Sequence, residues 1–266
     1  MRDDKIFGLL ALLLIAAAAA ALWYYRAPHG ATAPPAPPPP AEPRAEPPGG
    51  PRYPLPQDDS QAGQLERDLR PLPALDQSDG YFRLELVDLL GPGSGELIVE
   101  SGLIERIVAT VDNLPRQRIA ERIRPLAALP GRFTAEGQDD SGQYLLGESN
   151  FRRYDGLVEQ FAGVDMQRAL EVYRRYYPLF QKAYVGLGYP DGYFNDRLVE
   201  VIDHLLATPE VAAPIELVRP NVLYEFADPE LEALSGGQKL MLRLGPSNRR
   251  RVREKLEEMR ALVVAE

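Results

Sequence analysis

Cysteine is absent from the 266-residue sequence, and histidine occurs only twice. The lack of cysteine excludes disulfide bonds and thiolate metal sites, and it leaves the redox compartment undetermined. One histidine, His204, lies beyond residue 73, so a catalytic triad or a histidine-containing metal site in the later part of the chain has to use it. A Gly-x-Ser-x-Gly motif, which would supply a matching nucleophilic serine, does not occur.

Basic residues are outnumbered, and the net charge is −9. Residues 68–266 contribute −8 of it, from 24 basic and 32 acidic side chains. An acidic domain is a poor general binder of nucleic acid or of anionic lipid. We therefore expect no nucleic-acid partner.

Lysine is scarce, and none of the four lysines follows a glycine. This matters because residues 234–238, LSGGQ, resemble the signature loop of ABC transporter ATPases, which contacts a nucleotide phosphate. Such an ATPase also needs a Gly-Lys phosphate loop, so we expect neither a complete ABC ATPase nor a nucleotide partner. The structural interpretation is that Asp228 and Pro229 begin a helix that Gly236 or Gly237 ends. Anion binding by the amides of the next helix is the alternative.

Long hydrophobic runs are represented by one segment, residues 6–22, which carries no charge. Its 17 residues approach the lower length limit for a helix that crosses a bilayer, and three aromatic residues follow it directly. We expect residues 1–26 to form a cytoplasmic tip and an uncleaved transmembrane anchor, inserted through residues 6–25. A cleaved signal peptide is the alternative. Basic residues mainly precede the run, which favours export of the remainder.

Proline is concentrated in residues 27–73, which contain 15 of the 26 prolines. Proline fixes φ and removes a backbone donor, so we expect a disordered, semi-extended linker without a core. A ligand for a partner's groove is the alternative interpretation of this tract.

Residues 74–266 are long enough for one core, and their apolar periodicity is mostly helical. We predict a mainly α-helical single domain with a minor β-hairpin, preceded by one transmembrane helix and a Pro-rich tether. Helices are expected from Ser78, from Leu103, over 116–123, from Ser149 or Asn150, from Asp165 with a kink or break at Pro178, over 194–207, and two or three times from Pro229 to Val263. The hairpin is expected within 131–147 and an extended piece near 215–226. In the second of these helices, Leu103, Ile104, Ile107, Val111 and Leu114 should line one face.

The helix predicted over 194–207 has one apolar and one polar face. Asp196, Glu200 and His204 are four residues apart, so they lie along one stripe as weak candidates for a metal site. Glu200, Asp203 and His204 are the candidate catalytic residues if the protein is an enzyme. The alternative is a solvated helix face, and we expect no cofactor.

Six tyrosines fall within residues 173–193. Tyrosine combines apolar area with a hydroxyl, so it can line a binding surface, although packing in the core is the alternative. The candidate binding residues are Tyr176, Tyr177, Tyr189, Tyr193, Asn195, Asp196 and Arg197.

Three strings, at residues 109–116, 176–209 and 226–246, resemble a proteobacterial family named for its domain of unknown function, number 3014. The strings read ATVDNLPR, YYPLFQKAYVGLGYPDGYFNDRLVEVIDHLLATP and FADPELEALSGGQKLMLRLGP. The resemblance covers about residues 72–262. It implies a single-span envelope protein, and it brings no activity or catalytic residues.

Two functions follow as hypotheses for a protein of the bacterial inner membrane with its C-terminal domain in the periplasm. The first is a non-enzymatic interaction module that binds an envelope protein or a cell-wall glycan through the region of Tyr176 to His204. The second is an envelope hydrolase, directed at peptidoglycan, that uses Glu200 or Asp203 as acid or base.

Overall fold

The computed structural model describes residues 50–55, 71–127, 129, 133–137, 144–220 and 223–264. The predicted anchor, residues 1–26, and most of the linker predicted over 27–73 lie outside the described residues. Within the described part of the chain, no helix combines the length and the apolar character needed to cross a membrane.

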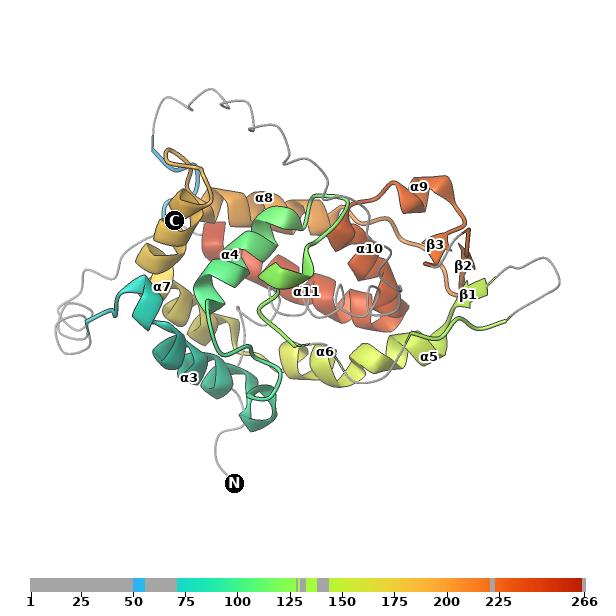
Figure 1. Ribbon diagram of the computed structural model, residues 1–266, viewed down its shortest axis with the longest axis horizontal. Coiled ribbons are helices and arrows are strands. Elements are labelled where there is room, and N and C mark those ends of the chain that lie inside the picture. The colour runs from blue at the N-terminus through green and yellow to red at the C-terminus, as the bar shows by residue number, and fades with distance from the viewer. Residues whose placement is uncertain are drawn as a thin grey trace, which may run out of the picture.

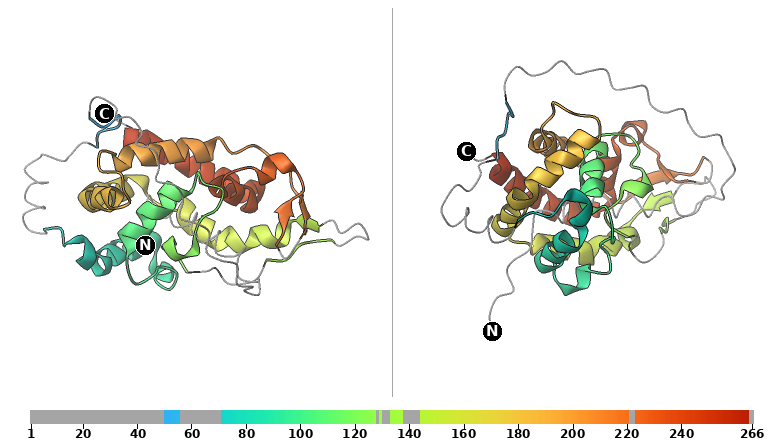
Figure 2. Two further views of the ribbon diagram at one scale, coloured as in Figure 1. Left: turned by 45° about the horizontal axis from the view of Figure 1, so that its top comes forward. Right: turned by 60° about the vertical axis from the view of Figure 1, so that its left-hand side comes forward.

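The fold is mainly helical, with a small sheet at one end (Figures 1 and 2). Helix α11 lies in the middle, and α5, α6, α7, α8 and α10 pack against it, while α4 packs on α7 and α8. The helices of the described residues are α3 (Asp79–Leu90), α4 (Leu103–Asn113), α5 (Glu148–Phe151), α6 (Asp155–Ala162), α7 (Met166–Gly186), α8 (Phe194–Leu206), α9 (Pro229–Glu232), α10 (Gly236–Arg243) and α11 (Gly245–Val264).

Apolar residues spaced three or four apart explain why these helices pack as they do. In α4 the buried stripe includes Ile104, Ile107 and Val111, as the periodicity predicted. Helix α7 begins where predicted, because the Asp165 side chain accepts hydrogen bonds from two first-turn amides. The larger core that results joins α3, α4, α6, α7, α8, α10 and α11.

The sheet is antiparallel, with the strands β1 (Tyr144–Leu146), β2 (Ile215–Val218) and β3 (Glu225–Phe226) in that order. Leu146 pairs with Ile215, and Leu217 pairs with Phe226. The predicted hairpin over 131–147 is present as an isolated antiparallel bridge between Glu136 and Leu145. The extended piece near 215–226 supplies β2 and β3, so the chain forms a three-stranded sheet with its own apolar cluster in addition to this bridge.

Three local predictions were wrong. Residues 116–123 form no α-helix, and Glu121–Ile123 is one 3-10 turn, because carbonyls of this stretch bond to other elements: that of Arg116 accepts from Gly236 and that of Ile123 from Thr110. Asn150 is no helix cap, since it lies within α5 and bonds to the backbone of Thr134. The break predicted at Pro178 is absent, because helix α7 continues through this residue and its packing on α4 and α11 outweighs one missing hydrogen bond.

Candidate functional site at the two ends of helix α8

Helix α8 carries most of the polar residues that the sequence indicated as a site, and the structure divides them between its two ends. The N-terminal end meets a short piece of the Pro-rich region, while the C-terminal end meets α10 and α11. Asn195, Asp196, Arg197 and Glu200 belong to the first end, and Asp203 and His204 belong to the second.

Asn195 is fully buried at the beginning of α8, where its side chain joins three segments. Its Oδ1 accepts a hydrogen bond from the Tyr173 hydroxyl of α7 at 3.2 Å. Its Nδ2 donates to the carbonyl of Val263 at 3.2 Å and to the carbonyl of Tyr53 at 2.8 Å. A buried amide needs such partners, so the segment around Tyr53 completes the surroundings of Asn195.

Asp196 holds the same segment, residues 50–55, by its backbone. The amide of Arg52 donates to Oδ2 at 3.0 Å, and the amide of Tyr53 donates to Oδ1 at 2.9 Å. The chain bends at these two residues, which turns successive N–H groups toward one carboxylate. The segment lies where α8 begins and α11 ends, and it is blue in Figure 1.

The side chains of this segment add a second set of contacts. Arg52 forms an ion pair with Glu200 at 2.6 Å, although 61% of the Arg52 side chain is exposed. Tyr53 and Leu55 are half-buried and pack against the main core. An exposed ion pair contributes little, so the bonds to Asp196 and the packed side chains provide most of the attraction.

The attachment of the segment is balanced by the cost of ordering it. Fixing the backbone costs roughly 1–2 kcal/mol per residue, whereas a hydrogen bond to a charged group contributes about 1.5–3 kcal/mol. Pro51 and Pro54 restrict the free chain and so reduce that cost. The two contributions thus have opposite signs and a similar order of magnitude.

Arg197 fixes this end of α8 to α4. Its Nε donates to Oδ1 of Asp112 at 3.0 Å, and its second guanidinium nitrogen donates to the Asp112 carbonyl at 2.9 Å. Asp112 is 3% exposed, and its Oδ2 also accepts from Arg116 at 2.9 Å and from the Tyr189 hydroxyl at 3.3 Å. Arg197 further pairs with Glu200 at 3.3 Å. The buried carboxylate of Asp112 therefore has a full set of hydrogen-bond donors.

The predicted binding tyrosines lie at different depths. Tyr176 is in the core, 4.9 Å from the ring of Phe82, and burial raises its pKa. Tyr177 and Tyr189 are half-buried, and Tyr193 is 37% exposed. Tyr189 stacks on Tyr184, whose pKa burial raises to about 12. Tyr193 and Tyr189 thus lie near the surface, whereas Tyr176 is a packing residue.

At the other end of α8, His204 lies against the first turn of α10. Its Nε2 is 2.8 Å from the Ser235 hydroxyl oxygen. Burial lowers the pKa of His204, and the positive charge of Arg197 lowers it further. A neutral imidazole lets the Ser235 hydroxyl donate to Nε2. Asp203 points elsewhere and pairs with Arg260 of α11.

The LSGGQ stretch starts α10, so the prediction that its glycines end the preceding helix was wrong. Ser235 caps α10, and its hydroxyl accepts from the Gln238 amide at 3.1 Å. The amides of Gly236 and Gly237 donate to the carbonyls of Arg116 and Leu114. The amide of Lys239, the fourth residue of α10, donates to the Ser235 carbonyl. Because all four amides are bonded within the chain, the alternative of anion binding at this helix start was also wrong.

Both glycines are closely packed, and Gly237 more tightly than Gly236. A Cβ on Gly237 would lie 2.9 Å from the backbone oxygen of Leu114 and 2.7 Å from the side chain of Leu205. A Cβ on Gly236 would lie 3.2 Å from the backbone oxygen of Arg116. Any side chain at Gly237 would push α10 away from α4 and α8. The pentapeptide is thus a helix-packing motif in this protein.

The candidate catalytic carboxylates are paired with arginines. Glu200 binds Arg52 and Arg197 with its two oxygens, and Asp203 binds Arg260. In the described residues, no three His, Asp or Glu side chains come together in a way that could hold a metal ion. Asp196, Glu200 and His204 share a helix but contact different groups, which explains why the predicted stripe does not converge.

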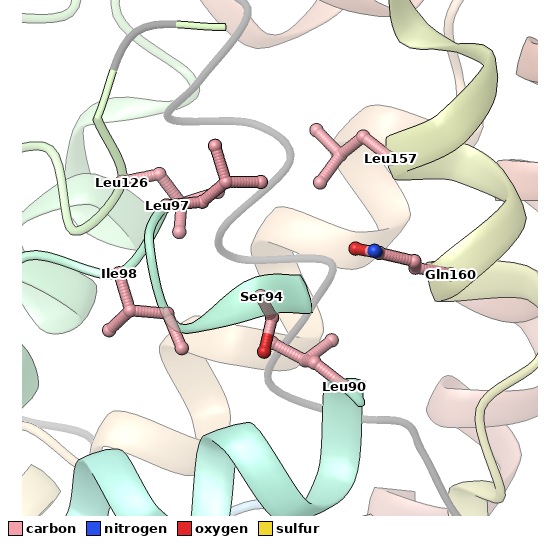
Figure 3. Close-up of a pocket in the computed structure, with 7 residues that line it drawn as sticks. All are labelled: Leu90, Ser94, Leu97, Ile98, Leu126, Leu157 and Gln160. Carbon is pink, nitrogen blue, oxygen red and sulfur yellow. The ribbon is translucent and has the colours of Figure 1, made fainter. Parts of the chain in front are cut away.

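A shallow hollow, whose water-accessible volume is only about 10 Å³, lies away from α8, between the end of α3 and α6 (Figure 3). Its walls carry no titratable side chain, and its polar groups are Ser94 and Gln160. The hollow is therefore unsuited to acid–base chemistry. The remaining lining residues are Leu90, Leu97, Ile98, Leu126 and Leu157.

A family model described as "Protein of unknown function (DUF3014)" matches residues 103–260, more than half of the chain. The chain belongs to this family. The matched region runs from α4 through most of α11, so it contains Asp112, Asn195, Asp196 and Glu200, while residues 50–55 lie outside it. Neither a curated protein nor a solved structure matches the chain.

Sequence reasoning missed three participants in this site: Asp112, Arg52 and Tyr53. Asp112 follows Ile104 and Val108 at intervals of four, so a carboxylate in phase with an apolar stripe was the available signal. Arg52 and Tyr53 interrupt a tract that is otherwise rich in alanine and proline.

Proposed function

We propose that this protein is an interaction module that binds a short, bent protein segment at the α8 N-terminal surface, meaning Asn195, Asp196 and Glu200 with Tyr189 and Tyr193 at the edge. The observation that carries the proposal is that residues 50–55 bind this surface through hydrogen bonds to Asp196 and Asn195. The surface donates and accepts through groups that match a peptide backbone. This favours a protein partner over the glycan that the tyrosines alone had left open.

The hydrolase hypothesis has less support. Glu200 and Asp203 are each neutralised by arginines. A general acid in a glycosidase needs a carboxyl whose pKa is raised by its surroundings. The arginines occupy both oxygens of Glu200 and the carboxylate of Asp203, so neither side chain is free to face a substrate.

The location is part of the same proposal. We propose that the members of this family are single-span envelope proteins. The apolar run over residues 6–22 supports an inner-membrane anchor. The excess of basic residues before that run supports a periplasmic position for the C-terminal domain. The Pro-rich region then carries the domain away from the bilayer.

The test is site-specific photocrosslinking of the full-length protein in bacterial cells. A photoreactive aromatic amino acid replaces Tyr193, or, as the matched control, Tyr81, which is 63% exposed on α3. We expect a discrete protein adduct from position 193 and none from position 81. Adducts from position 81 alone would move the interaction to α3 and contradict the proposal. In parallel, alkaline phosphatase fused to the C-terminus should be active, and an inactive fusion would contradict the periplasmic location.

A further inference from the structure

We infer that residues 50–55 act as a resident pseudoligand of the α8 N-terminal surface, and that the external partner presents a bend of the same chemistry, an arginine and an aromatic residue between prolines. This inference rests on the proposed function and names both the class of ligand and its regulation. The partner has to displace the segment of the chain itself.

The backbone contacts define the first requirement for a ligand. Asp196 accepts from two consecutive amides, and Asn195 donates to the carbonyl of the second of these residues. Proline has no amide hydrogen, so the two residues facing Asp196 cannot be proline. The neighbouring prolines, Pro51 and Pro54, leave the two donors between them and restrict the segment to few conformations.

The side chains define the second requirement. Exposure alternates along the segment: Pro51, Tyr53 and Leu55 are half-buried, whereas Arg52 and Pro54 are exposed. The half-buried side chains therefore contact an apolar surface, which favours apolar groups at these positions of a ligand. Arg52 reaches Glu200, which gives the surface a preference for a basic residue directly before the aromatic one.

The separation of surface and segment supports displacement. The surface lies inside the family domain, and the segment lies outside it. Only a few bonds hold the segment, and its arginine is 61% exposed. A tethered ligand competes at an effective concentration on the order of millimolar. If it covers the surface about nine-tenths of the time, an external ligand binds the native chain about tenfold more weakly than a vacated one.

The experiment measures the fluorescence anisotropy of a labelled, end-capped Gly-Pro-Arg-Tyr-Pro-Leu peptide on the full-length protein in detergent. The vacated chain carries Arg52→Ala with Tyr53→Ala. We expect it to bind the peptide about tenfold more tightly than the native chain does. Adding Asp196→Asn to the vacated chain should weaken binding at least tenfold. Adding Asp191→Asn, an exposed carboxylate beside the same surface, should change nothing.

Each other outcome overturns the inference. Equal affinity for the native and vacated chains would show that the segment does not compete. Equal binding of a peptide with glutamate in place of arginine would remove the proposed ligand chemistry. If the vacated chain did not bind the peptide although its melting temperature was unchanged, this surface would not be a receptor for the peptide. If only this inference fails and the proposed function holds, position 193 should still give protein adducts in cells. If the inference and the proposed function both fail, those adducts should be absent.

Discussion

The two ends of α8 carry similar polar residues and use them differently. At the N-terminal end, Asp196 and Glu200 hold a segment 140 or more positions away in the sequence, through groups partly open to solvent. At the C-terminal end, His204 bonds to Ser235, which is 6% exposed and caps the next helix. The neighbouring elements decide the role, since one end faces a removable segment and the other end faces the core.

The largest loss of stability should come from cutting the link between α8 and α4. In Asp112→Ala, the buried carboxylate disappears and Arg197 loses its main partner. Removing one member of a buried pair costs about 3–5 kcal/mol. We expect a fall of that size in the free energy of unfolding, measured by urea denaturation.

The control for this experiment is Asp88→Ala on α3. The Asp88 side chain is 66% exposed and 3.8 Å from Arg168, so its loss should cost less than about 0.5 kcal/mol. If both variants lost equal stability, Asp112 would not be the anchor of α8.

The C-terminal end can be disturbed alone by enlarging a glycine of the LSGGQ stretch. In Gly237→Ala, the new Cβ meets the backbone oxygen of Leu114, directly after α4, and a side chain of α8, so α10 has to shift. Overpacking of this kind costs about 1–3 kcal/mol. Thermal denaturation should show the loss. Gly80→Ala in α3, whose Cβ meets nothing within 4 Å, should be neutral or stabilising, and an equal loss there would contradict the packing role.

The same end should respond to pH. The pKa of His204 in the folded protein lies below its ordinary value of 6.5 because of burial. The unfolded chain therefore takes up a proton first, and stability that is fully present above pH 6.5 is lost as the pH falls toward the lowered value. Denaturation by urea at pH 7.5 and 5.5 measures this loss. His204→Gln should reduce it, and an unchanged pH dependence in that variant would assign the effect to other groups.

Periodicity in the sequence predicted the helical class, the apolar faces of α4 and α8, and the start of α7 at Asp165, because these depend on local spacing and capping. It could not predict the pairing of β1 with β2, because these strands lie about 70 residues apart in the sequence. The role of Gly237 was also invisible, since it depends on where Leu114 lies in space.

The candidate site was predictable in part for the same reason. Asn195, Asp196, Arg197 and Glu200 stood out as a polar cluster at a helix start. Their partners Asp112 and Arg52 are distant in the sequence, and a pattern of three- or four-residue spacing carries no information about them.

Weakening the contact between the N-terminal end of α8 and residues 50–55 should give the smallest change in stability and the clearest local change in structure. In Asp196→Asn, one oxygen that accepts a backbone amide becomes a donor, so Arg52 and Tyr53 lose one bond and the attraction of a charge. The free energy of unfolding should change by less than about 1 kcal/mol, because the gain from these bonds nearly offsets the ordering of the segment. Tryptic cleavage after Arg52, followed by mass spectrometry on the full chain, should nevertheless become several-fold faster. Asp191→Asn should leave the rate unchanged. Equal rates in all three proteins would mean that Asp196 does not hold the segment, and the contrast between the two ends of α8 would then be lost.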